Sequence, residues 1–205
     1  MFIRSQGARV VLVVLALSAS ACGSANPRPE LAPDPDRSVV KQAPAWFLAP
    51  PREADFLLTA ATTTSRDMQV AIDKARLQAR AELATQMEAK LEALGKRFAE
   101  EGSEPQASSL MQQYSATTKA IVSTVLNGSR PRTQVVQTEG EIYRAYVLME
   151  LPTGPASVAL MQKMQQNQQM ANRFRATQAF KELEKDVAKF EAAKGGAGTP
   201  EREAR

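Results

Sequence analysis

Residues 65–98 read SRDMQVAIDKARLQARAELATQMEAKLEALGKRF, and this stretch decides the fold. Apolar residues recur in it every three or four positions, which is the spacing of one face of an α-helix. They are Met68, Ile72, Ala75, Ala79, Leu83, Met87, Leu91, Leu94 and Phe98. We therefore predict one long helix that begins after Ser65 as its N-cap and ends at Gly102 and Pro105. The alanines in its first half would let the helix approach a sheet closely.

Three further segments have the composition of β-strands. Residues 55–63 are rich in apolar residues and threonine and are too short for a typical helix. Residues 132–138 and 141–151 are strand-like and lie on either side of Glu139-Gly140. This arrangement predicts a β-hairpin with a two-residue turn.

Alternation along residues 141–151 assigns side chains to two faces of the sheet. One face is compatible with a core throughout and carries Tyr143, Ala145, Val147, Met149 and Leu151. The other face mixes charged residues with three apolar ones, Ile142, Tyr146 and Leu148. A sheet with a single packed face should be polar on its other side. These three residues therefore predict partial cover by another element or by a second subunit, and we take them as candidate interaction residues.

Two more helices are predicted. Residues 106–126 form a second amphipathic stripe, which Asn127-Gly128 ends. Residues 155–194 are predicted to form a C-terminal helix whose last part has a heptad-like apolar seam. The seam consists of Phe180, Leu183, Val187 and Phe190. It either packs on its own domain or binds a second copy or a partner. Residues 195–205 are predicted to be a disordered tail.

Residues 1–21 have the pattern of a secretory signal. Two arginines precede an apolar run over residues 10–17, which is shorter than the roughly 20 residues that a membrane span needs. Small residues follow and end at Ala21, and the only cysteine of the chain, Cys22, comes next. We predict a lipoprotein signal peptide, cleaved between Ala21 and Cys22, and a lipid attached to Cys22.

The cleavage motif also allows a second interpretation. Ala19 stands three positions before Cys22, where lipoprotein signals usually carry Leu. The sequence Ala19-Ser20-Ala21 suits ordinary signal peptidase as well, which would release a soluble periplasmic protein that begins at Cys22. For the lipidated form, Gly23 stands where an Asp would resemble the inner-membrane retention signal. The outer membrane is therefore favoured.

Residues 22–51 are predicted to be an acylated N-terminus followed by a Pro-rich tether. Seven of the 12 prolines lie between Asn26 and Pro51. Each proline fixes its own φ and favours an extended form of the residue before it. Trp46 and Phe47 lie within this segment, and they either fold back to cap the core or bind a partner.

The composition excludes most catalytic chemistry. The chain has no histidine and one cysteine. These counts exclude Ser-His-Asp and Cys-His catalytic arrangements, histidine-ligated metals, intrachain disulfides and Cys-x-x-Cys pairs. Glu82, Glu88 and Glu92 fall between the apolar positions of the long helix, and Asp55 has no neighbouring acid. We therefore expect no catalytic residue, no metal and no cofactor apart from the lipid on Cys22.

The charge gives no reason to expect nucleic acid as a partner. Lys and Arg number 26 against 22 Asp and Glu. Removal of the signal would remove two of the arginines, so the mature chain would be nearly neutral. A nearly neutral chain lacks the positive field that non-specific binding to nucleic acid requires.

Three segments together resemble the LPP-twenty family of outer-membrane lipoproteins. They are Pro44-Ala45-Trp46, residues 71–84 (AIDKARLQARAELA) and residues 143–148 (YRAYVL). The resemblance implies an α+β domain over residues 52–154, in which a long helix packs on a three-stranded antiparallel sheet. The second helix and the C-terminal helix depart from the family pattern. The family brings no catalytic residues.

These features predict a function in the bacterial envelope. The leading hypothesis is a non-enzymatic structural or interaction module, anchored by lipid in the outer membrane and facing the periplasm. As such it would form a homo-oligomer or bind another envelope protein. The alternative is a periplasmic protein that binds a small ligand, which needs a concave apolar pocket with convergent polar groups. An accessory role in flagellar outer-membrane disks or rings is suggested by the family resemblance alone.

Overall fold

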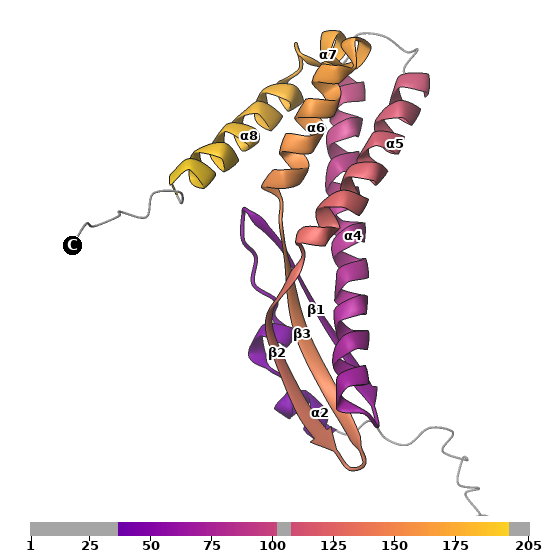
Figure 1. Cartoon of the computed structure of the whole chain (residues 1–205), viewed down its shortest axis with the longest axis vertical. Coiled ribbons are helices and arrows are strands. Elements are labelled where there is room, and N and C mark those ends of the chain that lie inside the picture. Colours follow the sequence, from indigo (N-terminus) through magenta and orange to yellow (C-terminus); the bar gives the residue numbers. More distant parts are fainter. Residues whose placement is uncertain (1–36, 102–107, 197–205) are drawn as a thin grey trace, which may run out of the picture. The chain divides into compact units, whose positions relative to one another are not determined.

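A computed structural model of the protein describes residues 37–101 and 108–196. Of these, the residues from Lys41 onward belong to one compact unit. The class is α+β, as the sequence predicts (Figure 1). The described elements are α2 (Arg37–Gln42), α3 (Ala45–Leu48), β1 (Phe56–Ser65), α4 (Met68–Glu101), α5 (Ser108–Val125), η1 (Leu126–Gly128), β2 (Arg130–Glu139), β3 (Ile142–Pro152), α6 (Gly154–Gln166), α7 (Gln168–Phe174) and α8 (Gln178–Gly196).

β3 is the central strand of a three-stranded antiparallel sheet with the order β1-β3-β2. In the register, Thr59 of β1 lies opposite Met149, and Gln134 of β2 lies opposite Val147. The three predicted strands are confirmed. β2 extends beyond its predicted bounds at both ends, whereas β1 and β3 each begin one residue later and end one or two residues later than predicted.

The hairpin turn between β2 and β3 lies one residue later than predicted. Glu139 pairs with Ile142, so the two turn residues are Gly140 and Glu141 rather than Glu139 and Gly140. Gly140 has a φ of +55°. Two-residue hairpin turns need a left-handed φ at their first position, and glycine adopts it without steric cost.

One face of the sheet packs against the first half of α4. Ala71, Ala75 and Ala79 are completely buried there. Because these side chains are small, the helix backbone comes within hydrogen-bonding distance of the sheet. The Thr59 hydroxyl donates to the carbonyl of Ala79 at 2.9 Å, and the Thr63 hydroxyl donates to the carbonyl of Ala71 at 2.6 Å. The predicted close approach of helix and sheet is therefore present, and two side-chain hydrogen bonds reinforce it.

The second half of α4 extends past the sheet and packs against helices (Figure 1). Gly95 makes room for Tyr114 of α5, since a Cβ at Gly95 would lie 2.8 Å from Cδ1 of the tyrosine ring. The Tyr114 hydroxyl donates to the carbonyl of Leu91 at 2.7 Å. Burial raises the pKa of Tyr114. Phe98 stacks on Phe174 at a centroid distance of 4.8 Å and so joins α4 to α7.

The predicted apolar face of α4 is confirmed, with corrections at Met68, Leu94 and Gly95. Met68 is exposed because it lies at the start of the helix, and Leu94 is half-buried. Gly95 occupies the buried position beside Leu94, where the ring of Tyr114 fills the space.

The N-cap of α4 is not Ser65, as predicted, because Ser65 is the last residue of β1. The N-cap is Asp67, whose carboxylate accepts from the backbone N–H of Val70 at 2.9 Å.

The segment predicted as one helix over residues 155–194 forms three helices, so the prediction of a continuous helix is wrong. Asn167 has an extended backbone, with φ −105° and ψ 99°, and its side chain caps α7 by accepting from the N–H of Met170. Thr177 caps α8 in the same way by accepting from the N–H of Phe180 at 3.2 Å. Both breaks occur at polar side chains that compete for the backbone. The three helices belong to the same compact unit as the sheet.

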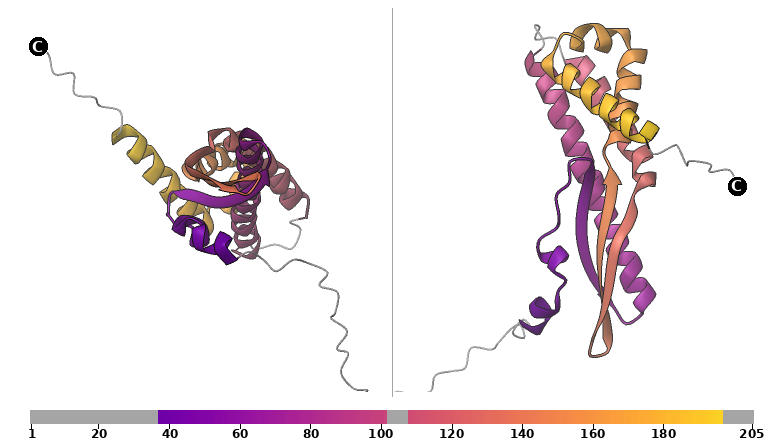
Figure 2. Two further views of the ribbon diagram at one scale, coloured as in Figure 1. Left: turned by 90° about the horizontal axis from the view of Figure 1, so that it is seen from below. Right: turned by 90° about the vertical axis from the view of Figure 1, so that its left-hand side faces the viewer.

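The end of the predicted tether also packs on the folded unit. α3 contacts β3 and β1, on the face of the sheet opposite α4 (Figure 2). Its Phe47 ring meets the ring of Tyr146 edge-on at a centroid distance of 4.9 Å. An extended tether that continues to residue 51 is therefore wrong for residues 44–48, and it is also wrong for residues 37–42, which form α2. The partial cover predicted for this face comes from the chain itself.

Replacing Ala75 with Leu should lower the free energy of unfolding by about 1–3 kcal/mol, because the larger side chain has no room between α4 and the sheet. Ala81→Leu is the matched control, since Ala81 is exposed on the same helix. It should change the free energy of unfolding by less than about 0.5 kcal/mol. Urea unfolding followed by circular dichroism measures both values. Equal losses in the two variants would contradict close packing at Ala75.

Candidate functional site

A groove of about 330 Å³ opens where the sheet ends and the C-terminal helices begin. It lies between the start of β1, the end of β3, the start of α6 and the second half of α8. Its apolar wall includes Phe56, Pro152 and Phe190, and its polar groups include Thr153 and Ser157. This combination of an apolar wall and a few polar groups is typical of a site for a small molecule.

Four charged side chains also line the groove. Asp55 and Lys189 form an ion pair at 2.6 Å, and both are well exposed. Lys90 and Asp186 also line it. Neither of these two is in an ion pair or a side-chain hydrogen bond within the described part of the chain. The groove thus offers one unpaired ammonium and one unpaired carboxylate to a ligand.

The groove continues between α4 and α8 into a second cavity of about 270 Å³. Lys90, Ser157 and Asp186 line both cavities. Leu91 and Leu183 contribute apolar surface to the second one. The two cavities therefore form one continuous depression along the junction of α4 and α8.

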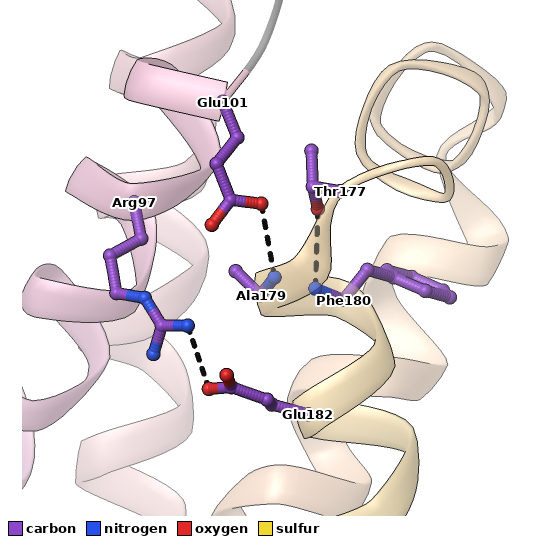
Figure 3. A network of polar contacts seen from close by, with 6 residues as sticks. All are labelled: Arg97, Glu101, Thr177, Ala179, Phe180 and Glu182. Carbon is purple, nitrogen blue, oxygen red and sulfur yellow. Dashed lines mark hydrogen bonds and ion pairs between the residues drawn. The ribbon is translucent and has the colours of Figure 1, made fainter.

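Polar contacts from α4 fix the start of α8 (Figure 3). A carboxylate oxygen of Glu101 accepts from the backbone N–H of Ala179 at 3.1 Å, and Arg97 forms an ion pair with Glu182 at 2.7 Å. The hydrogen bond to Glu182 raises the pKa of Arg97. Glu101 lies at the positive end of the α8 dipole, where a carboxylate is stabilising. Together with the Thr177 cap, these contacts set the direction of α8 and so position one wall of the groove.

Near the other end of α8, a glycine of α6 leaves room for Phe190. A Cβ at Gly154, the first residue of α6, would overlap the ring of Phe190. Any larger residue at this position would therefore force the ring of Phe190 to move. The groove keeps its present shape because Phe190 rests directly on the backbone of Gly154.

The structure places the predicted C-terminal seam within the unit itself. Phe180 and Leu183 are each only 3% exposed, and Val187 packs against the same core. The interpretation that this helix packs on its own domain therefore holds. Phe180 and Leu183 present no surface to a partner in this fold. Phe190 is half-buried and lines the groove.

The other predicted interaction residues lie on the face of the sheet opposite α4, or in α3, which covers that face. Tyr146 and Leu148 are 1% and 2% exposed beneath the aromatic cover from α3, and they too are unavailable to a partner in this fold. Ile142 and both aromatic residues of α3, Trp46 and Phe47, are half-buried. Burial raises the pKa of Tyr146, and its hydroxyl is buried without a hydrogen-bond partner among the described residues.

Several predictions lie outside the described residues. The signal peptide, its cleavage site at Ala21 and the lipid attachment at Cys22 all fall within residues 1–36. Of the predicted tail, Gly195 and Gly196 belong to α8, and residues 197–205 lie outside the described part.

Sequence reasoning did not find the charged groups of the groove. The sequence gives no sign that Asp55 pairs with Lys189, which lies 134 positions later in the chain. Lys90 and Asp186 follow the ordinary pattern of charges on an exposed helix face. No local signal distinguishes them, because the fold of α8 onto α4 brings them together.

No cluster of three or more histidine, cysteine or acidic residues suited to a metal ion occurs in residues 37–101 and 108–196. Across the same ranges, no helix combines the length and apolar character needed to span a bilayer.

No protein-family model matches the chain, and no curated protein is similar to it in sequence.

Proposed function

We propose that the protein is a lipid-anchored lipoprotein of the bacterial envelope and that its folded unit is a non-enzymatic interaction module in the periplasm. The observation that carries the proposal is the position of the single cysteine. Cys22 directly follows an apolar segment and a run of small residues that suits cleavage. A lone cysteine in an exported chain has no intrachain disulfide partner, so attachment is the role that its position favours.

The outer-membrane assignment rests on Gly23 and on the resemblance to the LPP-twenty family, and the fold is compatible with that resemblance. The Ala-rich residues 71–84 form the part of α4 that packs on the sheet, and residues 143–148 form the first part of the central strand. The Pro44-Ala45-Trp46 segment leads into the cover on the opposite face of the sheet. The segments that resemble the LPP-twenty family thus contribute to the contact of helix and sheet and to the cover on the other face.

Labelling with a radioactive fatty acid, followed by membrane fractionation, tests the anchor. The wild-type chain should incorporate the label and sediment with the outer membrane. Cys22→Ser should incorporate none and should be released as a soluble periplasmic protein, because Ala19-Ser20-Ala21 suits ordinary signal peptidase. The double variant Cys22→Ser with Ser24→Cys is the control, since it keeps a thiol but moves it by two positions, and it should remain unlabelled. Unlabelled, soluble wild-type protein would instead establish the alternative of a soluble periplasmic form.

A second candidate function is the binding of a small amphipathic molecule, and the groove beside α8 favours it. Its volume of about 330 Å³ is at the lower end of the range for ligand sites. The apolar wall would hold the body of such a molecule. Lys90 or Asp186 would hold a charged end, because neither has a partner of opposite charge within the described residues. This function is compatible with a lipid anchor.

Fluorescence titration with 1-anilinonaphthalene-8-sulfonate, an apolar anion, tests this second function on the soluble Cys22→Ser protein. Ala193→Trp should weaken binding at least tenfold, because Ala193 lines the groove and the indole would fill it. Ala192→Trp is the matched control, since Ala192 is exposed on the same helix and does not line the groove. It should bind the dye as the parent does. Equal binding by both tryptophan variants would exclude the groove as the site.

A further inference from the structure

Two arginines of α4 face a separate cavity on the flank of the sheet. Arg76 and Arg80 are four positions apart, so their side chains lie on the same side of the helix. The cavity has a volume of about 330 Å³ and is lined by Arg76, Leu77, Arg80, Ser129, Pro131 and Met149. No acidic residue is among these six. The two arginines are therefore the only charged residues that line the cavity.

Both guanidinium groups are held in place by uncharged acceptors. Nη2 of Arg76 donates to the side-chain oxygen of Gln134 at 2.8 Å. Nη2 of Arg80 donates to the backbone carbonyl of Leu126 at 2.9 Å and to the side-chain oxygen of Asn127 at 3.4 Å. These contacts hold the Arg80 group against η1 and the Arg76 group against the middle of β2, and they leave both charges unneutralised.

The neighbouring arginines of β2 are different. Arg130 forms an ion pair with Glu150 at 2.5 Å, and Arg132 forms one with Glu53 at 2.6 Å. Neither Arg76 nor Arg80 is within 4.0 Å of a carboxylate in the described residues. Of these four neighbouring arginines, only the two at the cavity lack an acidic partner among the described residues.

Leaving two like charges together has a physical cost. Like charges four residues apart on a helix destabilise it. In addition, Nε of Arg76 is buried without an acceptor among the described residues, and an unsatisfied buried donor is unfavourable. A bound anion would remove the repulsion between the two guanidinium groups.

We propose that Arg76 and Arg80 form a binding site for a phosphate-bearing group. A guanidinium presents several N–H donors in one plane, which matches two oxygens of a phosphate. Two such groups, one turn apart and already held by neutral acceptors, can both turn donors toward the same anion. The exposed Leu77 between them, at 70% exposure, offers apolar contact to the rest of the ligand. The phosphate belongs either to a lipid headgroup or to a free phosphate compound, and the proposal does not depend on the lipid anchor at Cys22.

Isothermal titration calorimetry on the full chain in a nonionic detergent, at constant ionic strength, tests the site. The probes are inorganic phosphate, glycerophosphoglycerol as the headgroup of an anionic lipid, and glycerophosphocholine as a zwitterionic headgroup. Binding of glycerophosphoglycerol but not of inorganic phosphate would support the site and assign the lipid source. The reverse would support the site and assign a free phosphate compound, and binding of both would support a general phosphate site. Failure of every probe to bind at millimolar concentration would overturn the proposal.

The variant Arg76→Gln/Arg80→Gln should weaken the binding of any effective probe at least tenfold. Arg80→Gln alone should also weaken it, and this variant alters only an exposed side chain. The control is Arg175→Gln, which removes one exposed positive charge beyond the far end of α4. Because Phe174 stacks on Phe98, this charge lies roughly 30 Å along the helix from the cavity. Binding that survives in the double variant, or that falls equally in Arg175→Gln, would overturn the proposal, provided that thermal unfolding shows both variants to be folded.

Discussion

The close contact between the backbone of α4 and the sheet is the constraint on which the rest of the structure depends. Small side chains at Ala71, Ala75 and Ala79 remove the usual spacing between a helix and a sheet. The hydroxyls of Thr59 and Thr63 then reach the carbonyls of the helix. Each such hydrogen bond contributes only about 0.5–1.5 kcal/mol net. Their larger effect is to fix the position of α4 along the sheet, because each threonine has one carbonyl within reach.

Three of the helices beyond the sheet, α5, α7 and α8, are positioned from α4. Tyr114 fits against Gly95 and places α5, and Phe174 stacks on Phe98 and places α7. The carboxylate of Glu101 caps α8. The first half of α4 packs on the sheet and the second half packs on these helices. The groove lies at the junction, because neither the sheet nor the helices fill the space there. The candidate ligand site is therefore a consequence of how far α4 extends past the sheet.

The sequence predicts those parts of the fold that rest on local periodicity. The stripe of α4, the three strands and the mixed face of β3 follow from alternation or from helical spacing, and the structure confirms them. The sequence does not predict the breaks at Asn167 and Thr177. A helix of Gln-rich composition tolerates either residue until a tertiary contact favours the cap. The groove was equally hidden, because Asp55 and Lys189 meet only after the chain has folded. The predicted interaction residues are apolar side chains for which the sequence pattern shows no packing neighbour. In the folded chain, most of them pack against other residues of the same unit.

Native-state hydrogen exchange, resolved by residue, tests most directly whether the α4–sheet contact holds the structure together. Contacts that form the base of a fold open only on global unfolding, whereas peripheral elements open at lower free energy. The backbone amides of Ala75 and Ala79 in α4 and of Val147 in β3 should therefore exchange with the full free energy of unfolding. Those of Val187 and Phe190 in α8 should exchange at a lower free energy. Exchange of the α4 amides at a lower free energy than those of α8 would contradict the account.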